Sequence, residues 1–295
     1  MHRFLRSIGF GNLTREQAKQ LVYDTVGKAD RRGYTIDSDE VMIAEFTREY
    51  GDNIGICVSG TFDDQDTFHP DYYYPYLRGQ GVTSYEDVTV ERHAAGDSYA
   101  GVVDDLRVGI SLVFYLQNKI PYVKALSAGQ LPLRGTSLTL SALSTGGNII
   151  LPLLKAPDDV ERLKKDASRR VKLMNDARGG DETAIETLTL EDMDLYAEVT
   201  KRMHDEDVFS LVDTTLMPYG VECDQYMIVG EITEIRKVDN HITGEEVYIL
   251  SVLVNDLTFD VAINIMDLVG EPLVGRRFKG AIWLQGRINF PETAI

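Results

Sequence analysis

Residues 106–117 carry the most regular apolar pattern in the chain, because every second position in this segment is apolar. A period of two is typical of a β-strand that buries one face. Two shorter extended runs, residues 41–46 and 54–58, flank the triplet Gly51-Asp52-Asn53, whose residue types favour a turn. The pattern predicts a long strand in the first segment and a hairpin in the second.

A further pair of extended runs covers residues 137–143 and 149–154, and the segment between them contains Gly146 and Gly147. Glycine supplies the positive φ angles that tight connections need, so these runs are predicted to pair as a hairpin. Strands that follow one another without intervening helices favour an antiparallel sheet.

Helical periodicity is found near the start and in the middle of the chain. Thr14 and Gln17 have the spacing of a capping box, and the helix that they begin is predicted to end at Gly33. In the middle, Gly179-Gly180 is predicted to end a helix, because glycine is favoured just past a helix end. Three helices are predicted there, beginning at Pro157, at Thr189 and at Asp207.

Extended runs follow one another in the carboxy-terminal part of the chain, with a short helical segment before the last. The order strand, strand, strand, short helix, strand resembles an OB-like small barrel, and Gly230 stands where a long first strand would bend. No extended run follows Phe290, so the barrel is predicted to be incomplete or closed by another segment. The strands are predicted over residues 227–235, 247–254, 257–263 and 280–290, with Ile232, Ile249, Val261 and Trp283 in the interior.

These elements together predict an α+β fold in three parts. Residues 1–155 are expected to form an antiparallel-sheet domain, residues 156–222 a helical connector, and residues 223–295 an OB-like small β-barrel. A chain of 295 residues has room for one large domain or two modest ones, which is compatible with this division.

The formal net charge of -17 at pH 7 narrows the set of partners. Sequence-independent binding of nucleic acid depends on Lys and Arg side chains, so DNA and RNA are disfavoured as partners. No apolar run approaches the roughly 18 residues of a membrane span, and the first residues lack the apolar block of a signal peptide. We therefore expect an acidic, cytoplasmic protein with no membrane partner.

Residues 63–76 form the most unusual stretch, since they combine several carboxylates, a histidine and a cluster of tyrosines. Carboxylates with an imidazole could hold a cation such as Mn²⁺ or Zn²⁺ and so support metal-assisted hydrolysis. The spacing matches no defined metal loop, and we instead predict an exposed acidic turn without high metal affinity, whose tyrosines fold back over the sheet. The residues of the hypothetical metal site are Asp63, Asp64, Asp66, His69 and Asp71.

The tripeptide Gly96-Asp97-Ser98 resembles the surroundings of some hydrolytic serines, with His93 and Asp104 or Asp105 nearby in the sequence. Members of a catalytic triad are brought together by the fold rather than by sequence proximity, and Gly-Asp-Ser is a common turn. A hairpin turn is therefore the preferred interpretation of this motif.

Two further motifs are interpreted as structural. The run from His204 to Asp207 lacks the second histidine of a zinc-protease helix. Cys57 lies in an apolar run and far from Cys223, which favours a buried side chain over a nucleophile or a zinc ligand. No residue is assigned as catalytic, cofactor-binding or metal-binding, and no cofactor is expected.

Six basic residues of the carboxy-terminal module could converge on one face and, beside an exposed aromatic ring, bind a single nucleic-acid strand. Acidic residues outnumber them in the same module, which disfavours this hypothesis. Trp283 lies between Ile282 and Leu284, so it is predicted to be buried and structural rather than a stacking platform. The six basic residues are Arg236, Lys237, Arg276, Arg277, Lys279 and Arg287.

Three segments, residues 1–10, 257–261 and 280–286, resemble an uncharacterised bacterial family of domain-of-unknown-function proteins. The family is similar in length over the whole chain. The resemblance implies a cytoplasmic bacterial protein, and it supplies neither an activity nor catalytic residues.

A recognisable catalytic constellation is missing from the sequence, and the OB-like order is often used for binding. Both observations favour a non-catalytic accessory protein that recognises another protein. Two alternatives stay open: a metal-assisted hydrolase that uses residues 63–71, and single-strand nucleic-acid binding by the carboxy-terminal module.

Overall fold

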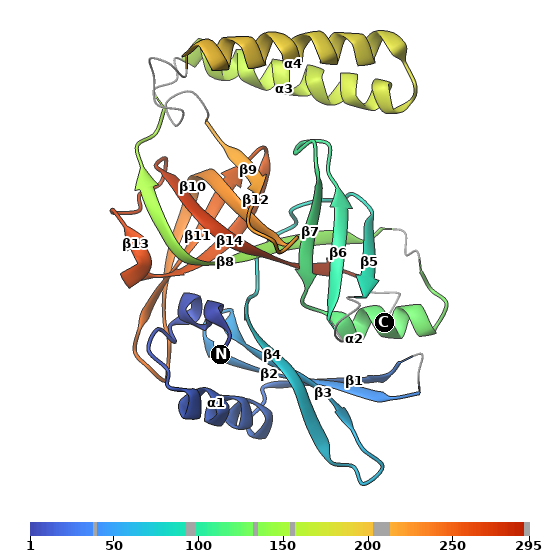
Figure 1. Ribbon diagram of the computed structural model, residues 1–295, viewed down its shortest axis with the longest axis vertical. Helices are drawn as coiled ribbons and strands as arrows, with labels where there is room; N and C mark the ends of the chain where they lie inside the picture. Colours follow the sequence, from blue (N-terminus) through green and yellow to red (C-terminus); the bar gives the residue numbers. More distant parts are fainter. Residues whose placement is uncertain (38–39, 93–97, 132–134, 154–156, 203–212, 292–295) are drawn as a thin grey trace.

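The structure is a computed structural model that describes residues 1–37, 40–92, 98–131, 135–153, 157–202 and 213–291. Figure 1 shows a strand-rich molecule in which a barrel lies between a smaller sheet and a helical hairpin. The helices are η1 (Arg3–Ile8), α1 (Arg15–Gly27), α2 (Lys119–Ser127), α3 (Pro157–Arg178), α4 (Glu182–Arg202) and η2 (Ile265–Asp267), where η marks a 3₁₀ helix. The strands are β1 (Arg31–Ile36), β2 (Met42–Gly51), β3 (Ile54–Phe62), β4 (Phe68–Leu77), β5 (Val88–Arg92), β6 (Tyr99–Asp104), β7 (Ser111–Leu116), β8 (Ser137–Ile150), β9 (Thr215–Pro218), β10 (Gln225–Asp239), β11 (Glu246–Val254), β12 (Leu257–Asn264), β13 (Leu268–Val269) and β14 (Arg277–Asn289).

The first sheet of the described chain contains β1, β2, β3 and β4 in that order, all antiparallel. The predicted hairpin is confirmed, because β2 pairs with β3 and Asn53 takes a φ of 62° at the turn between them. On β2, Glu45 stands between Gly33 of β1 and Ser59 of β3. This register places Glu45 on the second strand of the sheet, next to the edge strand β1, beside which α2 packs.

The capping box that begins α1 is confirmed. The Thr14 hydroxyl accepts a hydrogen bond from the Gln17 backbone N–H, and the Gln17 side chain accepts one from the Thr14 N–H. The helix ends at Gly27 rather than Gly33. Gly33 instead lies in β1. Pairing with β2 provides hydrogen-bond partners for the backbone N–H and C=O groups of this segment, which a longer helix would have bonded internally.

Strands β10, β11, β12, β8 and β14 close into a barrel in that order within the described chain, and β14 pairs back to β10. β8 runs parallel to β12 and antiparallel to β14, so it fills the gap that the carboxy-terminal strands leave open. The barrel is thus closed by an upstream strand that lies within residues 1–155. The domain division at residues 155 and 222 stays a prediction.

β8 is one continuous strand, so the hairpin predicted over residues 137–154 is wrong. The glycines of this segment allow close packing instead of a turn. A Cβ atom on Gly147 would lie 2.3 Å from Cε2 of Phe278, which is closer than any side chain tolerates. The Phe278 ring therefore occupies the space that glycine leaves in the wall of the barrel.

Strands β5, β6 and β7 extend this sheet beyond β14, and β7 is parallel to β14. The strand predicted over residues 106–117 begins only at Ser111, so its first half is wrong. Asp105 accepts two hydrogen bonds from the Arg107 guanidinium, at 2.8 and 2.5 Å, and Gly109 takes a φ of 74°. These local bonds hold the segment in a turn that apolar alternation alone does not reveal.

Two large apolar clusters form the core, one inside the barrel and one between the barrel, η1 and the first sheet. Ile232 and Val261 lie inside the barrel, as predicted. The prediction is wrong for Ile249 and Trp283, which belong to the second cluster. Because η1 and the first sheet cover the outer wall, these strands are apolar on both faces, and the pattern could not distinguish inside from outside.

α3 and α4 form a hairpin that stands apart from the barrel (Figure 1). The helix predicted to end at Gly179-Gly180 is confirmed. The next begins at Glu182 rather than Thr189, because Asp181 caps it by accepting hydrogen bonds from the backbone of Thr183 and Ala184. The third predicted helix falls largely on residues 203–212, outside the described residues, and its last positions belong to β9.

Within the described segments, none of the helices combines the length and the apolar character that crossing a lipid bilayer requires.

A candidate anion-binding pocket

The first sheet, α2 and β14 enclose a cavity of about 270 Å³, which we call the cationic pocket. Among the described residues, four side chains with positive charge line it, against a single carboxyl group, Glu45. The excess of positive charge in the pocket is opposite in sign to the net charge of the whole chain, which is -17. The four cationic residues are Arg31, Arg78, Lys124 and Arg287.

Several elements position these cations. Arg31 lies at the start of β1 opposite Thr47, and Arg78 directly follows β4, where its backbone N–H donates to the Asn53 carbonyl. Arg287 stands in β14, and Lys124 is on α2. The pocket therefore exists only when the sheet, the barrel and α2 are assembled.

The junction between β7 and α2 fixes β14 on both sides of Arg287. The Gln117 backbone N–H donates to the Gly286 carbonyl at 2.8 Å. The Asn118 amide donates to the Ile288 carbonyl at 2.8 Å, and its oxygen accepts from the Ile288 N–H at 3.1 Å. Gln117 and Asn118 thus serve as positioning residues at the wall of the pocket.

The positive charge of the pocket is only partly balanced by the protein. Glu49, the next acidic residue along β2, approaches Arg78 at 3.0 Å and Arg31 at 4.0 Å. The Arg287 side chain has no ion pair or hydrogen bond with any residue in the described part of the chain. Partial burial, together with repulsion from Arg78 and Arg31, lowers the pKa of Arg287.

Glu45 forms the acidic part of the wall and is buried. Burial raises its pKa to about 7, against the opposing attraction of Lys119. Its Oε1 atom is buried without a hydrogen-bond partner, and so is the hydroxyl of Tyr76 in the same wall. Unpartnered buried polar atoms are rare in folded proteins, so two of them on one pocket mark it as a functional candidate.

A buried polar cluster lies behind Glu45. Lys119 Nζ donates to the Ser59 hydroxyl at 2.6 Å and to the Tyr72 hydroxyl at 3.0 Å. Burial opposes the charge of Lys119, but the attraction of Tyr72 and Glu45 outweighs it and raises the Lys119 pKa. Cys57 is buried in this cluster, as predicted, and burial raises its pKa well above the usual value. A neutral thiol is a poor nucleophile, which agrees with a structural role for Cys57.

The acidic segment folds as a local turn ahead of β4. Asp63 accepts hydrogen bonds from the Gln65 and Thr67 backbone N–H groups and lies 2.8 Å from Nε2 of His69. Asp66 takes a φ of 57°, which fits a turn. Two of the tyrosines, Tyr74 and Tyr76, are buried, and they belong to β4 itself rather than folding back over the sheet. Throughout the described residues, no group of at least three His, Cys, Asp or Glu side chains is placed to hold a metal ion.

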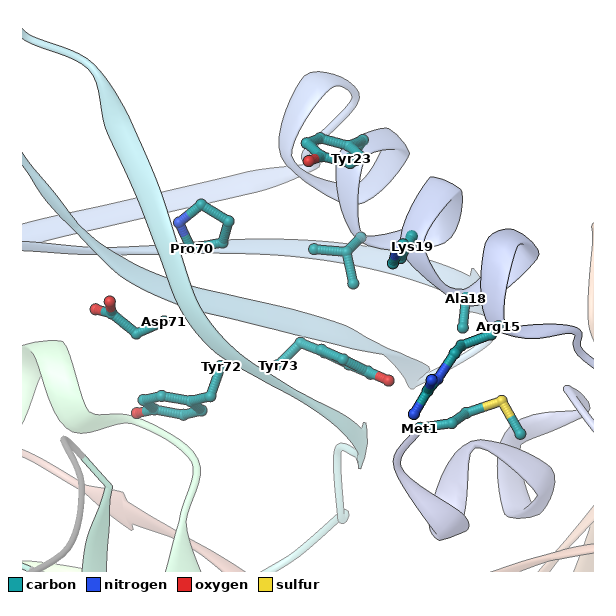
Figure 2. Close-up of a pocket in the computed structure, with 10 residues that line it drawn as sticks. Met1, Arg15, Ala18, Lys19, Tyr23, Pro70, Asp71, Tyr72 and Tyr73 are labelled. Carbon is teal, nitrogen blue, oxygen red and sulfur yellow. The ribbon is translucent and has the colours of Figure 1, made fainter.

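Asp71 is separated from this turn and lines a different cavity, of about 310 Å³, between α1 and β4. Figure 2 shows Lys19 and Tyr23 on α1 across from Pro70 and Tyr73 on β4. This cavity is mostly apolar, and the Lys19 ammonium already approaches Glu16 at 3.8 Å. It therefore lacks the concentration of unbalanced charge that distinguishes the cationic pocket.

The motif around Ser98 is not assembled into a triad within the described residues. Asp105 is occupied by Arg107 and by the Ser84 hydroxyl at 2.6 Å, and Asp104 accepts a hydrogen bond from Ser111. His93, Gly96 and Asp97 lie outside the described residues, as does the run from His204 to Asp207.

The six basic residues of the carboxy-terminal module do not share one site. Arg236 pairs with Asp260 at 2.7 Å, and Lys237 approaches Glu246 at 3.7 Å. Of the six, Arg287 alone lines the cationic pocket.

Trp283 is buried, as predicted. Its indole N–H donates to Asp224 at 2.7 Å, and its ring stacks on Phe4 at 5.2 Å between centroids. The ring is thus held by the protein's own side chains.

Sequence reasoning missed the other members of the pocket, because Arg31, Glu45, Arg78 and Lys124 form no local motif. The one signal was Glu45, a charged residue beside Ile43 and Ala44 at the buried start of β2. A carboxyl group at a core position is uncommon and points to a functional or paired group.

Comparison with known proteins places the chain in a family. A search of the curated proteins and a search of the solved structures each gave no match. A family model described as a domain of unknown function from an E. rectale gene, DUF3881, matches residues 5–286. The match covers nearly the whole chain and confirms the resemblance inferred from the sequence. The chain therefore belongs to the DUF3881 family of domains of unknown function.

Proposed function

We propose that this protein is a cytoplasmic, non-catalytic accessory protein that binds a small anionic ligand in the cationic pocket. The observation that carries the proposal is the meeting of Arg31, Arg78 and Arg287 at one cavity, where Arg287 has no partner among the described residues. Cations held close together without enough counter-charge repel one another, which raises the electrostatic free energy of the empty pocket. A bound anion removes this repulsion.

The pocket favours a ligand that carries a phosphate, sulfate or carboxylate group. Guanidinium groups present a planar fork of N–H donors that matches these anions with two parallel hydrogen bonds. A cavity of about 270 Å³ is at the lower end of the range for small-molecule sites, which favours a metabolite-sized ligand over a polymer.

The barrel supports an OB-like assignment as part of the same proposal. The position of η2 between β12 and β14 and the closed order of five strands favour this assignment, in which β8 would supply the last strand from upstream. OB-folds that bind nucleic acid use the face of their second and third strands. In this protein, Ile249 of β11 and Ala262 of β12 pack in the same buried cluster as Phe4 of η1, so this surface does not favour single-strand binding.

The expected protein partner and the hydrolase alternative remain hypotheses. A protein partner is favoured by the exposed apolar side chains of α4, which include Ile185, Leu190 and Met193. The hydrolase alternative needs the carboxylates of residues 63–71 to share a centre. Asp63 and His69 bond to each other and Asp71 lines a separate cavity, which does not favour a shared centre.

Calorimetric titration of the full chain with inorganic phosphate, sulfate and succinate at low ionic strength tests the proposal. We expect at least one of these anions to bind, and Arg287→Gln to weaken its affinity about tenfold to a hundredfold, since a hydrogen bond to a charged group is lost. The matched control is Arg276→Gln, which removes a cation near the start of β14 that approaches Glu271 at 4.0 Å. Absence of binding by the wild type, or equal losses in both variants, would overturn the proposal.

A further inference from the structure

Glu45 shares the cationic pocket with the groups that would hold the anion. It is the one acidic residue among the described residues that line the cavity, and it stands on β2 between the pocket and the buried Lys119 cluster. When ionised, Glu45 is a counter-charge in the wall of the cavity, in addition to the Glu49 carboxylate that pairs with Arg78 and Arg31. A bound anion and an ionised Glu45 would then be two negative charges in a cavity of about 270 Å³, where they repel each other.

Charged groups are found both in the cavity that Glu45 lines and in the buried cluster behind it. On the pocket side are the guanidinium groups of Arg31, Arg78 and Arg287 and the ammonium group of Lys124. The guanidinium groups keep their charge over the whole pH range in which proteins are stable. They favour either a carboxylate at Glu45 or a bound anion, and so place the two in competition.

The buried side of Glu45 is formed by groups that do not change charge near neutral pH. Burial raises the pKa of Cys57, Tyr72, Tyr74 and Tyr115, so each stays neutral. The Lys119 pKa is raised by Tyr72 and Glu45, so this side chain stays charged. Glu45 itself, with a pKa of about 7, is therefore the group of this cluster that titrates near neutrality.

We propose, building on the function proposed above, that the pocket takes up a proton at Glu45 when it binds its anion. Glu45 is then a neutral acid in the complex and a carboxylate in the empty pocket at alkaline pH. The anion replaces the carboxylate as the partner of the cations, and the proton comes from solvent or buffer. Ligand affinity and Glu45 protonation are linked, so each strengthens the other.

The sign of the pH dependence follows from this exchange. Below about pH 7, Glu45 in the empty pocket is already protonated, and the anion meets the full positive charge. As the pH rises through this value, the empty pocket loses its proton and the complex keeps it, so the affinity falls. If the bound anion raises the Glu45 pKa by roughly one unit, the affinity falls about tenfold between pH 6 and pH 8.5.

The test uses sulfate, because its charge is constant over this range, whereas phosphate groups titrate near pH 6. Calorimetry of the wild-type chain at pH 6 and pH 8.5 should show the fall in affinity. Titrations at pH 7.5 in two buffers of different ionisation enthalpy should show net uptake of protons by the complex. These measurements need no variant and therefore do not depend on the folding of one.

Glu45→Gln should bind sulfate at both pH values with equal affinity, at least as tightly as the wild type at pH 6. Glu49→Gln is the matched control, because Glu49 lies four residues further along the same strand and pairs with Arg31 and Arg78. It should tighten binding yet keep the pH dependence. Sulfate binding that is independent of pH in the wild type, without proton uptake, overturns the proton coupling and leaves the proposed function intact. Absence of sulfate binding at both pH values overturns the inference, and the function fails with it when phosphate and succinate also do not bind.

Discussion

Trp283 and Glu45 show how single side chains connect the barrel to the first sheet. The Trp283 side chain points outward from the barrel wall. Its ring packs between Phe4 of η1 and Tyr115 of β7, each at 5.2 Å between ring centroids. The Glu45 side chain projects from the first sheet and lines the cationic pocket together with residues of α2. One residue stabilises the junction through apolar contact, and the other places a titratable group at it.

Trp283→Ala should lower the free energy of unfolding by about 3 to 5 kcal/mol, because a large buried ring is lost and the Asp224 carboxylate loses its indole donor. Trp283→Phe keeps most of the packing and should cost less. Thermal or urea unfolding measures both. Intrinsic fluorescence with acrylamide quenching provides the check on burial. An emission typical of water-exposed indole, with an unchanged melting temperature in the Ala variant, would contradict the structural role.

Glu45→Gln should stabilise the protein at alkaline pH more than at acid pH. The folded-state pKa of about 7 lies above 4.5, the ordinary value for a glutamate side chain, so the folded protein binds more protons between these two values. Stability contributed at this site therefore falls as the pH rises from 4.5 to 7 and stays low above 7. The variant should gain roughly 1 to 3 kcal/mol over the wild type at pH 8.5 and little at pH 4.5. Urea unfolding at both pH values measures this difference, and an equal effect at the two would contradict it.

At the scale of elements, β8 determines whether the barrel closes. It is the neighbour of both β12 and β14, and the glycine at position 147 lets it approach the Phe278 ring. The sequence pattern was misleading here, because paired glycines between two apolar runs are more often a turn than a point of close packing. The strong apolar runs of the carboxy-terminal strands, by contrast, were sufficient to predict β11 and β12 within one residue, whereas β10 extends to Asp239 and β14 begins at Arg277.

Gly147→Ala should destabilise the protein by about 1 to 3 kcal/mol, because its Cβ atom would lie 2.3 Å from the Phe278 ring and the barrel wall must shift. Gly146→Ala is the matched control, since a Cβ atom there meets nothing within 4 Å. Urea unfolding of the two variants makes the comparison. Similar stabilities would show that β8 does not pack against Phe278 as described.

The acidic turn before β4 should not bind Ca²⁺, Mn²⁺ or Zn²⁺ with micromolar affinity. The hydrogen bonds of Asp63 to backbone N–H groups and to His69 already occupy its carboxylate. Calorimetry with each metal measures this. Micromolar binding that disappears in an Asp66→Ala, His69→Ala double variant would favour the hydrolase alternative.

At the scale of the whole molecule, the sequence revealed local elements better than it revealed what joins them. The capping box of α1 and the hairpin of β2 and β3 depend on neighbouring residues and were predicted. Closure of the barrel and assembly of the cationic pocket depend on residues such as Arg31 and Arg287, which are far apart in sequence. Such long-range contacts leave no periodic signal in either segment, so the pocket could not be predicted.

The central claim is that the unbalanced cations of the pocket hold an anion, and a crystal structure with selenate tests it most directly. Selenate resembles sulfate in shape and charge, and selenium gives an anomalous signal that identifies its position. We predict an anomalous peak bonded to the guanidinium groups of Arg31, Arg78 and Arg287, and loss of this peak in Arg287→Gln. An empty cationic pocket in the wild type, at a selenate concentration that saturates binding in solution, would contradict the account.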